Sequence, residues 1–185
     1  MKYVIVGNTG VGKTSMLNTL TNNNDESLAT VGVSLYQYKC KYNDKDINLN
    51  LWDTAGQERY NSLSRSYYRN AVCIIFVFDL TDTKSFDDLV FWFEKVKNEH
   101  TDCHFIVIGN KNDNDNNRKI DYNSARTFAN EHKADYFEIS KYEKNMIKKI
   151  INDSIKKSVV YYEESIRFIK IPSRSIVAEK KYCEC

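Results

Sequence analysis

Short runs of β-branched and aromatic residues alternate with longer amphipathic segments along this chain. The runs predict strands over Lys2–Val6, Val33–Tyr42, Asp46–Trp52, Val72–Asp79, His104–Gly109 and Tyr136–Ile139. Apolar side chains three or four residues apart predict helices over Lys13–Leu20, Ser85–Asn98, Tyr122–Glu131 and Lys144–Tyr161, with a short helix near Leu63–Arg69. This alternation is typical of an α/β domain with a mostly parallel sheet.

One connection is too short to cross over between parallel strands. Asn43-Asp44-Lys45 joins the second and third runs and favours a hairpin, so we expect one antiparallel strand in a sheet of six, flanked by about five helices. After about Glu163 the helical pattern decays into a mixed basic and apolar stretch. We therefore expect one folded domain over 1–162 and a flexible tail over 163–185.

Composition and charge exclude several classes of protein. The 27 basic and 25 acidic side chains leave a net charge of +2, so no overall field attracts nucleic acid or lipid, and any membrane contact must be local. The longest apolar run, Ala71–Phe78, is too short to span a bilayer, and residues 1–7 do not resemble a signal peptide. Cys40, Cys73 and Cys103 lie in apolar runs, where we expect reduced thiols in a cytosolic protein.

Glycines are concentrated near the N-terminus, where three of the six occur in Gly7-Asn8-Thr9-Gly10-Val11-Gly12-Lys13-Thr14. This segment follows an apolar strand and opens a helix, which is the setting of a phosphate-binding loop. Its backbone N–H groups cradle phosphates, Lys13 adds a full charge at the terminal phosphates, and the Thr14 hydroxyl is expected to bind Mg²⁺. The expected nucleotide contacts are Asn8, Thr9, Gly10, Val11, Gly12, Lys13, Thr14 and Ser15. A simple glycine turn is the alternative.

A second motif identifies the base. Asn110-Lys111-Asn112-Asp113 follows a strand, and a carboxylate at Asp113 can accept from both the N1 and the exocyclic N2 donors of guanine, a pair that adenine lacks. A buried carboxylate without its partner is penalised heavily, so this residue can discriminate between bases by a factor on the order of 10⁴. We expect Asn110, Lys111 and Asp113 to bind guanine.

A third motif, Trp52-Asp53-Thr54-Ala55-Gly56-Gln57-Glu58-Arg59, lies between the other two. Asp53 ends a strand and can hold the metal through water, and the N–H of Gly56 is free to bind the γ-phosphate. Gln57 is the candidate for orienting the attacking water in phosphoryl transfer. Together with Lys13, Gly56 and Gln57 form the expected catalytic set.

These motifs resemble those of Ras-superfamily GTPases over residues 2–160, and Trp52–Tyr60 with Tyr67-Tyr68-Arg69 is similar to the Rab family. The resemblance implies a monomeric small G domain that binds GTP or GDP with Mg²⁺ and hydrolyses GTP slowly. It implies that Thr30 completes the Mg²⁺ site and that Leu35, Trp52 and Tyr67 face effectors. Exchange factors, GTPase-activating proteins and GDP-dissociation inhibitors are the regulators it implies, and residues 57–63 and 67–71 look most like early-endosomal Rabs.

Three positions depart from the family pattern. No aromatic residue lies between Thr14 and Thr30, where the family stacks a ring on guanine, so we expect faster nucleotide release unless another side chain covers the base. Ser140-Lys141-Tyr142 replaces Ser-Ala-Lys, and we expect Ser140 and Lys141 to keep the base contact with altered packing. Thr9 beside the γ-phosphate is expected to slow intrinsic hydrolysis.

The chain closes with Cys183-Glu184-Cys185 after the basic pair Lys180-Lys181. This ending resembles the one on which Rab proteins receive two geranylgeranyl groups, and two lipid chains anchor a protein stably where one does not. Lipidation of Cys183 and Cys185 would place the protein on the cytoplasmic face of intracellular membranes. A pair of exposed thiols or a weak metal site is the alternative.

Three functions are compatible with the motifs. The favoured one is an active regulatory GTPase of vesicle traffic. The segment from Lys13 to Thr30 is two residues shorter than is usual in the family that the sequence resembles. This difference leaves open a guanine-nucleotide-binding scaffold that does not hydrolyse GTP. A small P-loop kinase is the third, but it does not explain Asn110-Lys111-Asn112-Asp113.

Overall fold

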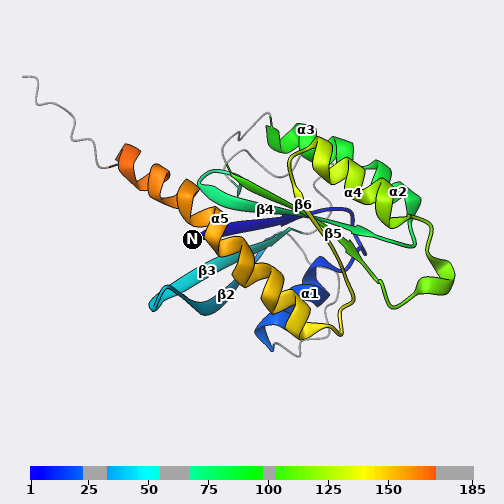
Figure 1. The fold of residues 1–185 in the computed structure, drawn as a ribbon, viewed down its shortest axis with the longest axis horizontal. Coiled ribbons are helices and arrows are strands. Elements are labelled where there is room, and N and C mark those ends of the chain that lie inside the picture. The colour runs from blue at the N-terminus through cyan, green and yellow to red at the C-terminus, as the bar shows by residue number, and fades with distance from the viewer. Residues whose placement is uncertain (23–32, 55–66, 98–102, 170–185) are drawn as a thin grey trace, which may run out of the picture.

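A six-stranded sheet with helices on both faces forms the domain in the computed structural model (Figure 1), which describes residues 1–22, 33–54, 67–97 and 103–169, with side chains to residue 163. The strands are β1 Lys2–Val6, β2 Val33–Tyr42, β3 Lys45–Thr54, β4 Ala71–Asp79, β5 His104–Asn110 and β6 Asp135–Ile139. The helices are α1 Lys13–Thr21, α2 Thr83–Asp87, α3 Leu89–Lys97, α4 Tyr122–Glu131 and α5 Lys144–Ile169, with a 3₁₀ turn, η3, over Asp115–Asn117.

The strand order is β2-β3-β1-β4-β5-β6. β2 runs antiparallel to β3, and every other neighbouring pair is parallel. Asn43 and Asp44 form the hairpin turn with φ of 48° and 60°, the left-handed conformation that two-residue hairpins require. The predicted α/β class, the six strands and the single antiparallel strand are confirmed.

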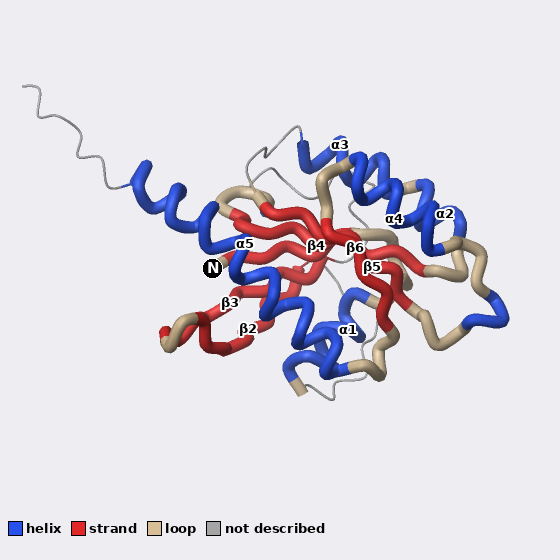
Figure 2. Tube along the Cα trace, in the orientation of Figure 1, coloured by secondary structure: helices blue, strands red, loops and turns tan. Residues whose placement is uncertain are grey.

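The helices form two layers, with α1 and α5 on one face of the sheet and α2, α3 and α4 on the other (Figures 1 and 2). β1 shows why both faces are covered, because its residues alternate between the two cores. Tyr3 and Ile5 pack toward α1 and α5, and Val4 and Val6 pack toward α3 and α4. Strands buried on both faces are expected in a parallel sheet sandwiched between helices.

β4 lies near the middle of the sheet and is buried along its whole length. It contains the longest apolar run of the sequence, which therefore forms core. Within the described residues, no helix is long and apolar enough to cross a membrane. Among the described residues Cys40, Cys73 and Cys103 form no disulfide, in agreement with the predicted reduced state, and the last two are buried.

Two predicted helices differ from the structure. The helix predicted over Ser85–Asn98 is interrupted at Asp88, whose carboxylate accepts a hydrogen bond from the distant Asn8 side chain. The last helix was predicted to end at Tyr161, but α5 continues to Ile169, so the part of the predicted tail over 163–169 is helical. No proline or glycine occurs between Tyr161 and Ile169 to stop it. Residues 63–66 of the short helix predicted near Leu63–Arg69 lie outside the described residues, and Tyr67 to Asn70 form a turn.

Parallel pairing brings the carboxyl ends of five strands to one edge of the sheet. In register, Ile5 of β1 lies beside Asp53 of β3, and Asp79 of β4 lies beside Asn110 of β5. Ligands of open α/β sheets bind in the crevice outside these strand ends. The loops that follow β1, β3, β5 and β6 carry the motifs singled out in the sequence, so the fold gathers them at this edge.

His104 is buried at the start of β5 and contacts several polar groups. Its Nε2 lies 2.9 Å from Asp135 Oδ2, its Nδ1 lies 4.0 Å from Cys73 Sγ, and Lys157 also binds Asp135. Burial lowers the pKa of His104 below its ordinary value of 6.5, and this effect outweighs the attraction of the Asp135 carboxylate.

This pKa shift makes stability depend on pH. As the pH falls through about 6.5, the unfolded chain protonates His104 more readily than the folded chain does, so acidification favours unfolding. We expect the free energy of unfolding, measured with urea, to fall between about pH 7.5 and 5.5. His104→Asn should flatten that dependence, and an equal slope in the variant would show that His104 does not cause it.

Candidate functional site

The loop after β1 adopts a conformation that depends on glycine. Gly7, Gly10 and Gly12 have φ of 144°, 81° and 96°. A Cβ at Gly7 would lie 2.1 Å from the Val77 carbonyl oxygen, and one at Gly12 would lie 2.2 Å from Asn110 Nδ2. Gly10 instead faces open space, with nothing within 4 Å of its Cβ position. The loop is therefore packed against the sheet on one side and open on the other.

Lys13 opens α1 and folds its side chain back over this loop. Lys13 is 5 % exposed, and its ammonium group donates to the carbonyl oxygens of Gly7 and Asn8, each at 2.9 Å. No side chain caps the first turn of α1 at Gly12. The positive end of α1 and the Lys13 charge thus both lie beside the backbone of this loop.

Asn8 connects the loop to the helices on the opposite face of the sheet. Its Nδ2 donates to Asp88 Oδ2 at 2.7 Å, and its Oδ1 accepts from Trp92 Nε1 at 3.1 Å. Both amide atoms are thus used in structural contacts. The side chain of Asn8 therefore holds the loop in place. The predicted contact of Asn8 with nucleotide stays a prediction.

Thr14 and Asp53 meet beside the same loop. Thr14 lies in the first turn of α1, and its hydroxyl donates to the carboxylate of Asp53. Asp53 is fully buried near the end of β3. The next residue, Thr54, donates from Oγ1 to the Ile5 carbonyl oxygen at 2.8 Å and fixes the strand end against β1. A hydroxyl and a carboxylate oxygen therefore converge at the point where the sequence predicted a metal.

Asn110 joins the loop after β1 to the loop after β5. Asn110 is 2 % exposed, and its Nδ2 donates to the Val11 carbonyl oxygen at 2.8 Å. This single hydrogen bond couples the two loops that the sequence assigned to phosphate and to base. The Cβ-free surface of Gly12 is what allows the Asn110 amide to approach so closely.

Lys111 follows with a φ of 67° and pairs its ammonium with the Asp79 carboxylate at the end of β4. Burial alone would raise the pKa of Asp79. Hydrogen bonds from Lys111 and from the N–H and hydroxyl of Thr81 bind its charged form, and they hold the pKa below its usual range. The pair ties the loop after β5 to the end of β4, and no local pattern in the sequence predicts it.

The loop after β6 lies next to the loop after β5. The N–H of Asn112 donates to the Ile139 carbonyl oxygen at 3.1 Å, which joins the two loops. Glu143 accepts from the Ser140 N–H at 2.7 Å, and the Lys141 carbonyl oxygen accepts from Thr19 Oγ1 of α1 at 2.8 Å. The loop after β6 is therefore held to α1 as well as to the loop after β5.

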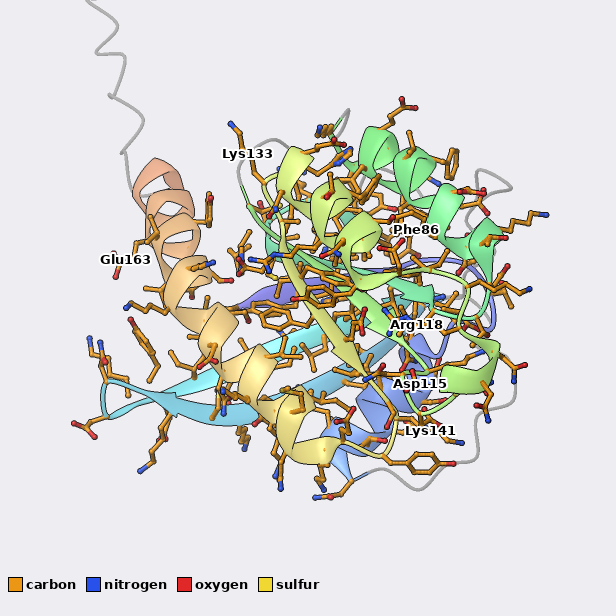
Figure 3. All side chains as sticks on the ribbon, turned by 45° about the vertical axis from the view of Figure 1, so that its right-hand side comes forward. Phe86, Asp115, Arg118, Lys133, Lys141 and Glu163 are labelled. Atoms are coloured by element: carbon orange, nitrogen blue, oxygen red, sulfur yellow. The ribbon has the colours of Figure 1, made fainter. Side chains whose placement is uncertain are left out.

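An ion pair behind these loops strengthens the arrangement. Arg118 binds the carboxylate of Glu138 with two nitrogens, donates from Nε to the Ile120 carbonyl oxygen at 2.7 Å and reaches Asn112 Oδ1 at 3.4 Å. Figure 3 shows Asp115, Arg118 and Lys141 on one side of the molecule, away from Glu163. The sequence interpretation missed Arg118 and Glu138, because nothing local indicates their pairing.

A cavity of about 390 Å³ opens between these loops, a volume within the range of about 300–1,000 Å³ that is usual for ligand sites. The structure places in its wall the predicted residues Gly10, Gly12, Ser15, Asn110, Lys111, Asp113 and Lys141, together with Asn114 and Tyr142, which we did not predict as contacts. A larger cavity of about 450 Å³ lies between α4 and α5, remote from the glycine loop. The smaller cavity is the one that adjoins the predicted chemistry.

Leu35, Trp52 and Tyr67 also come together, on another part of the surface. Leu35 of β2 is 52 % exposed and lies opposite Trp52 of β3 in the antiparallel ladder. The rings of Trp52 and Tyr67 meet edge to face with centroids 6.4 Å apart. The three residues form one apolar surface, which we call the hydrophobic triad.

Several predicted site residues lie outside the described residues. These are Thr30, Gly56, Gln57, Cys183 and Cys185. Their predicted roles stay predictions.

The residues present fit a nucleotide with Mg²⁺. Mg²⁺ prefers oxygen ligands and takes few from the protein, completing its shell with phosphates and water. Thr14 and Asp53 supply such oxygens, and the described part of the chain holds no cluster of three metal-binding side chains that would suit a more protein-rich site. The open space at Gly10 and the nearby charge of Lys13, which binds the carbonyl oxygens of Gly7 and Asn8 in the same loop, suit the phosphates.

Comparison with known proteins identifies the family. The model of the Ras family matches residues 2–160. The chain is 34 % identical over 164 residues to Ras-related protein Rab-11B of Dictyostelium discoideum, covering 87 % of this chain and 74 % of that protein. It is 35 % identical over 163 residues to Ras-related protein Rab-7a of Paramecium octaurelia, covering 84 % and 79 %.

A further relative is Ras-related protein Rab-2B of Dictyostelium discoideum, 37 % identical over 142 residues, which covers 75 % of this chain and 70 % of that protein. The match to the Ras family model spans all six strands, the glycine loop and the loops that follow β5 and β6. The chain therefore belongs to the Ras family: it is a Rab-type small GTPase that binds GTP or GDP with Mg²⁺, hydrolyses GTP and acts as a switch in vesicle traffic.

Proposed function

We propose that the guanine nucleotide lies along the carboxyl edge of the sheet, with its base in the 390 Å³ cavity and its phosphates on the glycine loop. The observation that carries this assignment is the composition of the cavity wall. Gly10 and Gly12 of the glycine loop line this cavity together with Ser15 of α1. Asp113 and Lys141, from the loops after β5 and β6, line the same cavity. One ligand with a phosphate end and a base end fits such a continuous site.

Each residue then has a distinct task. Asp113 accepts from the two guanine donors, while Asn110 holds the base loop to Val11. Lys13 turns from the loop carbonyls toward the terminal phosphates, and Thr14 and Asp53 would hold Mg²⁺ with Thr30. The metal ion, when bound, neutralises charge that develops on the phosphates. Gly56 donates to the γ-phosphate and Gln57 orients the attacking water.

Rab-type switches act through regulators and effectors on intracellular membranes in the cytoplasm. We propose that effectors dock on the hydrophobic triad, which gathers Leu35, Trp52 and Tyr67 beside segments 23–32 and 55–66 in the sequence. The regulators we propose are an exchange factor, a GTPase-activating protein and a GDP-dissociation inhibitor. Prenylation of Cys183 and Cys185 and an early-endosomal address complete the proposal.

Substitution of Asp113 tests the base site. Asp113→Asn replaces an acceptor with a donor, so the amide matches xanthine better than guanine. We expect GDP affinity to fall about a hundredfold or more and XDP affinity to rise. Competition against a fluorescent GDP analogue measures both.

The matched control is Asp115→Asn, the same substitution two residues further on, at an exposed position that does not line the cavity. It should leave the GDP affinity unchanged. Unaltered base preference in the Asp113 variant would remove Asp113 from the base site.

Substitution of Gln57 tests the hydrolytic step. Gln57→Leu removes the side chain that orients water and leaves the base and phosphate contacts intact. We expect intrinsic and partner-stimulated hydrolysis to fall roughly ten- to a hundredfold with nucleotide affinity unchanged, measured in a single turnover of radiolabelled GTP. Equal rates in the wild type and the variant would contradict the assigned role and favour a scaffold whose nucleotide state does not depend on Gln57.

A further inference from the structure

The proposed guanine site has an unusual feature: its described wall is almost entirely polar or glycine. A purine base presents two flat faces that favour contact with aromatic or apolar groups. The sequence from Ser15 to Ala29 contains no aromatic residue that could supply such a contact. An aromatic partner for the base must therefore come from another part of the chain.

The loop after β6 carries an aromatic residue at this site, Tyr142. Among the described residues that line the cavity, it contributes the only aromatic ring. Its side chain is 71 % exposed, more than any other large hydrophobic residue described. A ring left this open at the rim of a ligand-sized cavity is accessible to a ligand that enters the cavity.

The backbone that carries Tyr142 is fixed at three points. The Lys141 carbonyl oxygen accepts from Thr19 of α1 at 2.8 Å, the Tyr142 N–H donates to Ser140 Oγ at 3.3 Å, and the Tyr142 carbonyl oxygen accepts from the Lys144 N–H at 3.0 Å. Only the side-chain torsions remain to bring the ring over a base. The cost in conformational entropy is small for a residue with two such torsions.

Lys141 adds a second contact to the ring. Its ammonium lies 4.9 Å from the centroid of Tyr142, within cation–π distance. Because Lys141 also lines the cavity, its charge and the ring occupy the same rim. The neighbouring residue thus limits the directions that the ring can take.

We propose that Tyr142 stacks on the guanine base and forms the aromatic contact that the segment after Thr14 does not provide. This inference rests on the proposed guanine site. It assigns to the loop after β6 a part in holding nucleotide, beyond the backbone contacts of Ser140 and Lys141. An exposed tyrosine that contacts only protein partners is the competing explanation, and it predicts no effect on nucleotide release.

The test is the dissociation rate of a fluorescent GDP analogue from the full chain with Mg²⁺. A stacking contact of about 1–3 kcal/mol per base corresponds to about a 5- to 150-fold faster release in Tyr142→Ala. Tyr142→Phe keeps the ring and should remain within about twofold of the wild type. Tyr162→Ala removes another exposed tyrosine, on α5 and outside the cavity, and should release GDP at the wild-type rate.

A second readout reports stacking directly. In a spectrum of ring-labelled tyrosine, the Tyr142 ring protons should move upfield when GDP binds and stay unmoved when inorganic triphosphate binds, because only GDP brings a base. Wild-type release from Tyr142→Ala, or an unmoved ring resonance, would overturn the role of Tyr142. If GDP preference still depended on Asp113 in that case, the guanine site itself would stand. Failure of the wild type to prefer guanine over adenine nucleotides would instead overturn the proposed site.

Discussion

Parallel pairing of β1 with β3 on one side and β4 on the other determines where this protein can hold a nucleotide. Because the strands run in the same direction, their carboxyl ends and the loops that follow them lie at one edge of the sheet. Lys13, Asp53, Asn110 and Ser140 come from segments far apart in the sequence and meet there. β1 and β4 are buried on both faces, so a shift in their register would disturb the packing of both cores.

The loops at that edge are held to one another as well as to the strands. Asn110 binds the carbonyl oxygen of Val11, Asn112 binds that of Ile139, and Thr19 binds that of Lys141. In the proposed site, phosphate and base are therefore bound by parts of one connected structure. Because the loops are connected, a change at the phosphates can affect the rest of the site. A switch protein needs such a connection, since the state of its γ-phosphate must alter a surface that partners contact.

Much of the fold could be predicted because its signals are local. The strand over Val33–Tyr42 and the helix over Tyr122–Glu131 follow from residue type and periodicity, and both agree with the structure in their bounds. The interruption at Asp88 could not be predicted, since it involves a hydrogen bond with Asn8, eighty positions away. The end of α5 was placed too early because the sequence after Tyr161 loses its clear apolar stripe while still lacking a helix-breaking residue.

The site divides in the same way. Three glycines, a lysine and a threonine at fixed spacing predicted the phosphate loop. The structure shows why the glycines are needed, because all three have positive φ. The Lys111–Asp79 pair and the place of Tyr142 at the cavity rim depend on how loops pack against one another, which no local pattern encodes. The sequence identified Ser140-Lys141-Tyr142 as a departure from the family, and only the structure showed that Tyr142 borders the cavity.

The edge formed by these loops is the proposed position of the guanine nucleotide. Chromatographic analysis of the nucleotide released by denaturing the protein, after purification in Mg²⁺ buffer, tests this proposal. We expect GDP or GTP in a near-equal molar amount to protein, without adenine nucleotide. Adenine nucleotide in its place, or protein that is empty and stays empty after incubation with GDP and Mg²⁺, would contradict it.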